Sequence, residues 1–292
     1  MPTIDEKRVY SDAVGATPVY VASDLGVVRA TVSDDLVGEF GVARRGEAAD
    51  VAFDGVLAVA ADDVRVGPEF APTGFGATVA VGCHRGAVLA TDETGRVARL
   101  PASAVDRASA AHEEGGGDTG DEESAPDAVA SAWTDLGRVE EVRALDGPLV
   151  AAADGVCRAR EDDLAPAGLG AAEIRDVAGH GAPLAATDGG LYALANGWVV
   201  ADEAPTRTVD AAGDRAHAAG ESGIVARDDP GGSFAPVAAD FEPVGFAHLA
   251  DGVVAATADG TLHVTVGDDW RSRSVGVRGV SGVAAVTQAS EQ

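Results

Sequence analysis

The 292-residue chain is short of lysine, cysteine and aromatic residues. Lys7 is the only lysine, and 21 Lys plus Arg stand against 48 Asp plus Glu, which gives a net charge of −27. Such a surface repels phosphate groups, so we expect neither a nucleic acid nor a membrane as partner. Acidity with almost no lysine is typical of salt-loving archaea, where molar salt shortens the Debye length to ~3 Å and screens the self-repulsion.

The two cysteines, Cys83 and Cys157, form no CxxC motif, which excludes a disulfide framework and a zinc site of that type. The opening MPTIDEKRVY lacks the apolar region of a signal peptide. No run approaches the ~20 apolar residues that a membrane helix needs. We therefore expect a soluble, cytoplasmic and monomeric protein with two buried or half-buried thiols.

The segment from Pro183 to Asp202, PLAATDGGLYALANGWVVAD, shows how the chain is built. Short Ala/Val-rich stretches alternate with the turns Asp188-Gly189-Gly190 and Asn196-Gly197. Asn-Gly and Asp-Gly supply the positive φ angles of tight hairpins, so the segment predicts three short strands.

The same unit recurs along the chain, each time as an Ala/Val strand, an acidic turn and a second strand. The turns start at Asp24, Asp62, Asp92, Asp154, Asp188, Glu221 and Asp259. A fourth strand with its own turn precedes each hairpin. Four strands per ~35 residues indicate a β-propeller blade with a short repeat.

We therefore predict an all-β, seven-bladed β-propeller, with six blades as the alternative, that forms one domain over residues 1–292. A ring of blades must be closed or leave an open edge. The segment from Gly279 to Val286 is expected to close it as the innermost strand of the first blade. The segment from Lys7 to Tyr10 competes for that place. We expect no long amphipathic helix.

An acidic insert interrupts the third blade between its third and fourth strands. Residues 103–132 contain HEEGGGDTGDEESAPD and carry eight acids against one arginine. Low hydrophobicity and like charges predict a disordered surface loop or, as the alternative, a docking segment.

Matched positions in the first strands give the candidate binding site. Counting five residues back from the turn glycine, or from its equivalent Arg215, leads to Asp50, Asp176 and Asp210. We expect these acids to converge near the mouth of the central channel, either as a small polar pocket or as an ion-paired lining. The same strands contribute three arginines that could pair with the acids, Arg143, Arg175 and Arg207.

Other chemistry has weaker support in the sequence. The Asp-Gly turns lack the D-x-D-x-D-G spacing of a calcium loop, and His84 and His180 occupy turn positions. We therefore assign no metal, no cofactor and no catalytic residue. The three tryptophans, Trp133, Trp198 and Trp270, each open an outermost strand, which favours packing between neighbouring blades.

The segments VYVASDLGVVR (Val19 to Arg29) and SDDLVGEFG (Ser33 to Gly41), together with the ATDGGLYAL hairpin, resemble a family of uncharacterised haloarchaeal β-propeller proteins. The hairpin is also similar to repeats of quinoprotein-like and sensor-kinase propellers. The chain lacks the regular tryptophan of quinoprotein repeats and the S-x-D-x-G-x-T-W box of sialidases, which argues against those enzymes. The resemblance implies a propeller and carries over no activity.

The sequence is compatible with two functions. The first is a cytoplasmic, non-catalytic scaffold that binds protein partners on its faces. The alternative is an enzyme or a binding protein for a small ligand or metal, with its site at the channel mouth.

Overall fold

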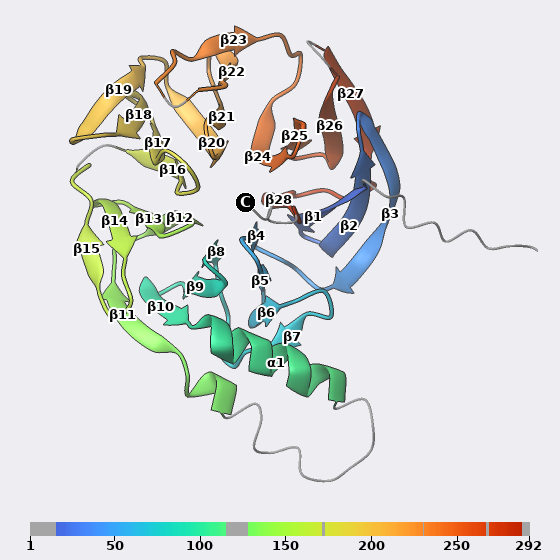
Figure 1. Ribbon diagram of the computed structural model, residues 1–292, viewed down its shortest axis with the longest axis vertical. Helices are drawn as coiled ribbons and strands as arrows, with labels where there is room; N and C mark the ends of the chain where they lie inside the picture. The colour runs from blue at the N-terminus through green and yellow to red at the C-terminus, as the bar shows by residue number, and fades with distance from the viewer. Residues whose placement is uncertain (1–15, 115–127, 171–172, 230, 267–268, 288–292) are drawn as a thin grey trace, which may run out of the picture.

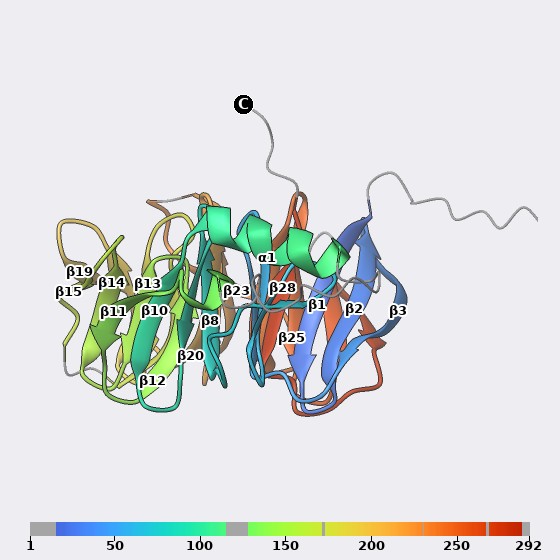
Figure 2. The same cartoon turned by 90° about the horizontal axis from the view of Figure 1, so that it is seen from below.

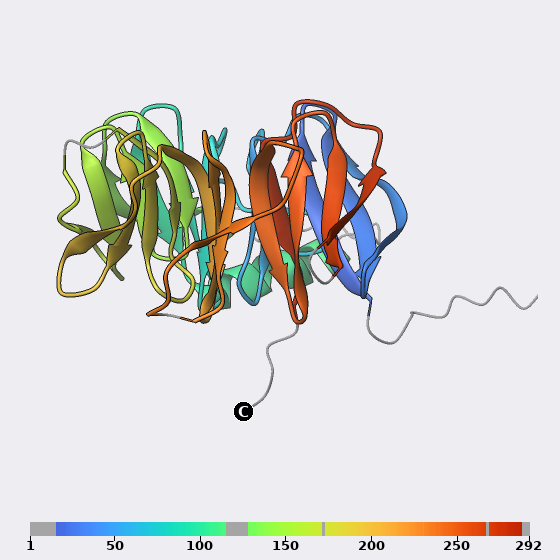
Figure 3. The ribbon, with the colours of Figure 1, turned by 90° about the horizontal axis from the view of Figure 1, so that it is seen from above.

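The computed structural model describes residues 16–114, 128–170, 173–229, 231–266 and 269–287. Seven four-stranded antiparallel sheets surround a central channel as the blades of a β-propeller (Figure 1). The prediction of seven blades is therefore confirmed. In side view the strands run along the axis of the ring (Figures 2 and 3).

The first four blades follow one another in the chain, and their strands are given from the channel outward. Blade 1 contains β28 (Gly282–Ala285), β1 (Thr17–Ser23), β2 (Gly26–Ser33) and β3 (Leu36–Arg45). Blade 2 contains β4 (Asp50–Phe53), β5 (Leu57–Ala60), β6 (Val64–Val66) and β7 (Ala71–Pro72). Blade 3 contains β8 (Ala80–His84), β9 (Ala87–Thr91), β10 (Arg96–Leu100) and β11 (Thr134–Arg138). Blade 4 contains β12 (Val142–Asp146), β13 (Leu149–Ala152), β14 (Gly155–Ala159) and β15 (Leu164–Pro166).

The remaining three blades complete the ring. Blade 5 contains β16 (Ile174–Ala178), β17 (Leu184–Thr187), β18 (Gly190–Leu194) and β19 (Trp198–Asp202). Blade 6 contains β20 (Thr206–Ala212), β21 (Arg215–Gly220), β22 (Gly223–Arg227) and β23 (Ala235–Val237). Blade 7 contains β24 (Pro243–Leu249), β25 (Gly252–Thr257), β26 (Thr261–Val266) and β27 (Asp269–Ser274).

The C-terminal strand closes the ring, as predicted. β28 pairs with β1, with Val21 opposite Val283 and Tyr20 opposite Ala284. The competing segment, Lys7 to Tyr10, lies outside the described residues. Blade 1 therefore joins the first and the last described strands in one sheet, and blades 7 and 1 adjoin in Figure 3.

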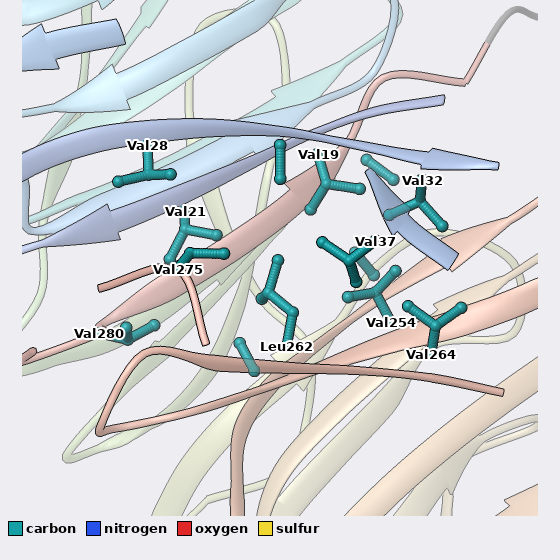
Figure 4. Packing of buried hydrophobic residues seen from close by; sticks show 14 of the residues in the cluster. Val19, Val21, Val28, Val32, Val37, Val254, Leu262, Val264, Val275 and Val280 are labelled. Atoms are coloured by element: carbon teal, nitrogen blue, oxygen red, sulfur yellow. The ribbon is translucent and has the colours of Figure 1, made fainter. Parts of the chain in front are cut away.

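Each junction between neighbouring blades holds one cluster of buried apolar side chains. Between blades 7 and 1, for example, one cluster contains Val21 and Val28 of blade 1 together with Leu262 and Val254 of blade 7 (Figure 4). Alanine and valine dominate because neighbouring sheets face each other closely. Each blade thus buries its flanks mainly against its neighbours.

The tryptophans join blades in pairs, as expected. Trp198 at the start of β19 donates its indole N–H to the Ala167 carbonyl of blade 4, at 2.8 Å. Trp133 and Trp270 make the same bond to Thr73 and Ala238, at 3.3 and 3.1 Å. Each indole therefore ties the outer part of its blade to the end of the preceding one.

The expectation of disorder is wrong for the first part of the acidic insert. Residues Ala102–Glu114 form helix α1, which lies across one face of the ring (Figure 2). Ala104, Val105 and Ala108 are buried in the cluster between blades 2 and 3. Their spacing places them on one side of a helix, a pattern that the acids of the whole segment concealed. Residues 115–127 lie outside the described part.

Candidate functional site

The innermost strands of the seven blades line the central channel and give it two mouths. We call the face that carries α1 the helix face, and the channel end on this face the helix mouth. In blades 2 to 7 the innermost strand comes first in the chain, and we call it the first strand of the blade. The hairpins after the first strands, such as Asp54-Gly55 and His180-Gly181, surround the helix mouth. The first strands begin at the opposite mouth, where Ala49 and Arg175 lie.

Five of the six predicted residues meet at the opposite mouth. They line a cavity of about 230 Å³: Asp50, Arg143, Arg175, Asp176 and Arg207. The matched positions of β4, β12, β16 and β20 therefore converge, as expected from the repeat.

The arginines do not pair with the two channel acids. Arg175 binds Asp188 at 2.6 Å, and Arg143 binds Glu141 at 2.9 Å. Arg207 lies 3.6 Å from Glu242, whose side chain is 85% exposed. The guanidinium groups thus bind acids outside the predicted set, and the expected Asp–Arg lining is absent from the described part of this mouth.

Asp50 and Asp176 instead join neighbouring blades. The Val81 backbone N–H of blade 3 donates to Asp50 Oδ2 at 3.0 Å. In the same way, Asp176 Oδ2 accepts bonds from the Val209 N–H and the Thr208 hydroxyl of blade 6, both at 2.9 Å. Each carboxylate therefore acts as a latch between first strands, and we call these bonds the inter-blade latches.

Burial changes the acidity of the carboxyl groups of Asp50 and Asp176. Burial raises the pKa of Asp50 and of Asp176 to about 7, although backbone N–H donors oppose the shift. Nearby carboxyl groups, among them Asp146, add to the increase. Near neutral pH these groups are thus poised between their neutral and charged forms.

Asp210 lies at the other end of the channel, contrary to the prediction. In the sheets, Asp176 pairs with Ala186 of β17, and Asp210 pairs with His217 of β21. The residue equivalent to Asp176 in blade 6 is Thr208, opposite Ala219. Asp210 is two residues further on, so its side chain keeps the same face of the strand but approaches the helix mouth.

The helix mouth contains the larger cavity, of about 450 Å³. Its polar lining includes Asp54, Asp146, Asp210, His180 and His248. Apolar walls come from the innermost strands β4, β12, β24 and β28, with Phe53, Leu145, Phe246 and Val283. A hollow with apolar walls and a few converging polar groups is the usual form of a small-molecule site.

His180 connects two of these carboxylates. Its Nε2 lies 3.4 Å from Asp146 Oδ1, and its Nδ1 lies 4.0 Å from Asp54 Oδ2. Burial raises the pKa of Asp146 to about 6, opposed by His180 and reinforced by Asp210. The backbone N–H of Gly179 also donates to Asp146, at 2.6 Å, so Asp146 is a further inter-blade latch.

A second network ends at Asp210. His248 Nδ1 lies 2.9 Å from Asp210 Oδ2, and His248 Nε2 lies 3.0 Å from His217 Nδ1. Burial, reinforced by His248, lowers the pKa of His217 to about 3, so this ring is neutral. In the tautomer with one proton in each bond, His248 Nδ1–H donates to Asp210 Oδ2, and His248 Nε2 accepts from His217 Nδ1–H. Both nitrogens of His248 are thereby engaged.

Sequence analysis did not single out His217 and His248. The available signal was their place within otherwise apolar strands, RAHAAG and PVGFAHL, where a polar side chain needs a buried partner. Their contact also requires the packing of blade 6 on blade 7. His84 and His180 lie at hairpins, as expected.

The described residues contain no group of three or more His, Cys, Asp or Glu side chains arranged to hold a metal ion. Cys83 is buried and Cys157 is half-buried, and both thiols are free. No helix in the described part of the chain has the length and apolarity required to cross a bilayer.

Comparison with known families gives a match along almost the whole chain. The family model described as "Beta-prop_HVO_0234:-like, beta propeller" covers residues 3–286. The chain belongs to this β-propeller family. No curated protein matches it.

Solved structures support the same fold at low sequence identity. The computationally designed Ika8 protein is similar with a TM-score of 0.56 and 12% identity, over 92% of this chain and 90% of that one. The WD40 β-propeller domain of Doa1 gives a TM-score of 0.54 and 14% identity, over 89% and 90%. Apo AztD from Citrobacter koseri gives 0.50 and 12%, over 93% and 98%. At these identities the likeness concerns the fold alone.

Proposed function

We propose that this β-propeller is a non-catalytic scaffold that binds a protein partner along the outer edge of blade 1. The observation that supports it is the outermost strand β3. This strand has ten residues, and the five consecutive residues from Glu39 to Ala43 are exposed. A long exposed edge offers backbone groups that another strand can pair with.

The other outer strands are shorter than β3, and all of them except β19 carry further features that normally prevent such pairing. They have two to six residues each. Three of them contain proline, at Pro72, Pro166 and Pro236. β11 and β27 are rich in charged and polar residues. Against this background β3 is the edge that is least protected, which favours a role in binding.

The side chains of β3 indicate the chemistry of the partner. Leu36, Phe40 and Val42 are 56%, 39% and 41% exposed. Arg273 of blade 7 already donates to the carbonyl groups of Val37 and Gly38. The available edge therefore begins at Glu39, and it suits an extended segment of another protein with apolar side chains at alternate positions.

The experiment is crosslinking of the tagged protein in a salt-loving archaeal host, followed by mass spectrometry. We expect a partner crosslinked within residues 39–45, which Val42→Lys removes. Val200→Lys on β19 is the matched control, because Val200 is 52% exposed on another outer strand. Retention of the partner by Val42→Lys, or crosslinks confined to other blades, would contradict the proposal.

A second candidate is binding of a small ligand at a mouth of the channel, with or without catalysis. The helix-mouth cavity favours it, because carboxylates and imidazoles from several blades converge there between apolar walls. Both functions fit a protein of the cytoplasm of a salt-loving archaeon, which we propose from the 48 acidic residues and the single lysine.

A further inference from the structure

We propose that the helix-mouth cavity binds a small organic cation, namely a primary amine or diamine on a short apolar body. This inference rests on the second proposed function and gives it a ligand class. It is independent of a partner at β3, because the helix-mouth cavity opens at the channel whereas β3 lies on the outer rim.

The charge of the lining favours a cation. Three carboxylates reach the cavity, from Asp54, Asp146 and Asp210. Among the described residues that line it there is no lysine or arginine. An ammonium group would therefore meet acceptors of opposite charge, and the basic side chains among the described lining residues are the imidazoles of His180 and His248.

Asp210 is the acceptor best prepared for such a ligand. His248 engages Oδ2 at 2.9 Å and is itself fixed by His217 at 3.0 Å. The contact of His248 Nδ1 with Oδ2 fixes the orientation of the Asp210 carboxyl group. The second oxygen, Oδ1, is left for a ligand, and the two imidazoles hold the carboxylate in place.

A directly bound metal ion fits this cavity less well. Both ring nitrogens of His248 are engaged, and no metal-binding group of three is present among the described residues. An ammonium group needs only hydrogen-bond acceptors and no fixed coordination geometry.

The walls suit the apolar part of the ligand. Phe53, Leu145, Phe246 and Val283 line the cavity. Its volume of about 450 Å³ lies within the range of small-molecule sites. A short aliphatic chain would cover these side chains while its amino groups face the carboxylates.

The test is isothermal titration of the full chain in molar potassium chloride with 1,4-diaminobutane and with its uncharged analogue 1,4-butanediol. We expect saturable binding of one diamine per chain and at least ~10-fold weaker binding of the diol, the usual effect of losing a charged hydrogen bond. Asp210→Asn keeps an acceptor for His248 but removes the charge, and should weaken diamine binding ~10-fold or more.

Asp214→Asn is the matched control, because Asp214 is exposed in the adjacent hairpin and does not line the cavity. We expect it to change diamine affinity less than roughly two-fold in molar salt. Thermal melts of both variants establish that they fold. Absence of saturable diamine binding, equal binding of the diol, or equal effects of the two variants would overturn the inference. Tighter binding of calcium that also depends on Asp210 would overturn it as well. Retention of the β3 crosslinks in Asp210→Asn would show that the two functions fail separately.

Discussion

Asp176 accepts a hydrogen bond from the backbone N–H of Val209, 2.9 Å away on the first strand of the next blade. The same carboxylate accepts the Thr208 hydroxyl and the N–H of Val177. One side chain thus serves three donors and links blade 5 to blade 6. Its role in stability can be tested directly.

Asp176→Ala leaves these donors without their acceptor in a partly buried place. We expect the free energy of unfolding to fall by about 3 kcal/mol, measured by urea titration in molar salt. Glu242→Ala is the control, since the Glu242 side chain is 85% exposed and pairs loosely with Arg207. Equal stability of the two variants would show that the latch contributes little.

The raised pKa values of Asp50 and Asp176, about 7 in each case, predict that stability falls as the pH rises. In the folded chain both groups hold a proton up to about pH 7, whereas in the unfolded chain they lose it near pH 4. Their stabilising contribution is therefore complete below pH 4 and is lost as the pH rises through 7. Each group contributes a slope of about 1.4 kcal/mol per pH unit within this window.

Other buried groups modify this profile. Asp146, with a pKa of about 6, acts in the same direction. The pKa of His217 is lowered to about 3, and this acts in the opposite direction. Below about pH 6.5 the ring binds a proton in the unfolded chain but not in the folded one, so stability falls with the pH. Burial also lowers the pKa of His84 and of His263, which act in the same direction as His217. The increases in the pKa of Asp50 and of Asp176, from 3.8 to about 7, outweigh these effects, so unfolding midpoints should be higher at pH 5 than at pH 8. Asp176→Asn should flatten the profile, and an unchanged slope would contradict the assignment.

Helix α1 should protect its only arginine from protease. Arg107 is exposed, but it lies within a helix fixed by Val105, which is 3% exposed. Trypsin cleavage after Arg107 therefore requires the helix to open. We expect Val105→Asp to be cleaved there at least ~10-fold faster than the wild type, because a buried charge detaches the helix. Asp106→Ala, on the exposed side, should behave as the wild type. Equal cleavage of all three would show that α1 is not fixed to blades 2 and 3.

The two thiols should react in a fixed order. Cys157 is half-buried, whereas Cys83 is fully buried on β8, and burial raises the pKa of both thiols. Iodoacetamide should modify Cys157 slowly in the folded protein and Cys83 only after unfolding, as peptide mass spectrometry can measure. Modification of Cys83 in the folded state would indicate that blades 2 and 3 separate readily.

The blades could be predicted from the sequence because their signals are local. An Asp-Gly turn such as Asp188-Gly189-Gly190 acts through backbone conformation, and Gly190 indeed has a φ of 131°. Ala/Val strands of similar length then repeat the unit. Closure by β28 followed from the same pattern, since a ring must satisfy its last edge.

The candidate site was harder to predict because it depends on register. The count in blade 6 started at Arg215, whereas the positive-φ glycine of that turn is Gly213, with a φ of 60°. Five residues before Gly213 is Thr208, which is the observed equivalent of Asp176. The contact of His217 with His248 could not be derived at all, because it forms only when two blades pack.

The pairing of β28 with β1 also constrains when the protein can mature. The ribosome synthesises β1 before the strands of the other six blades and β28 after them. Until Ala285 has emerged, blade 1 has no inner strand, and the valines that face blade 7 lack part of their cover. The strands of the other six blades are therefore all synthesised before the ring can close.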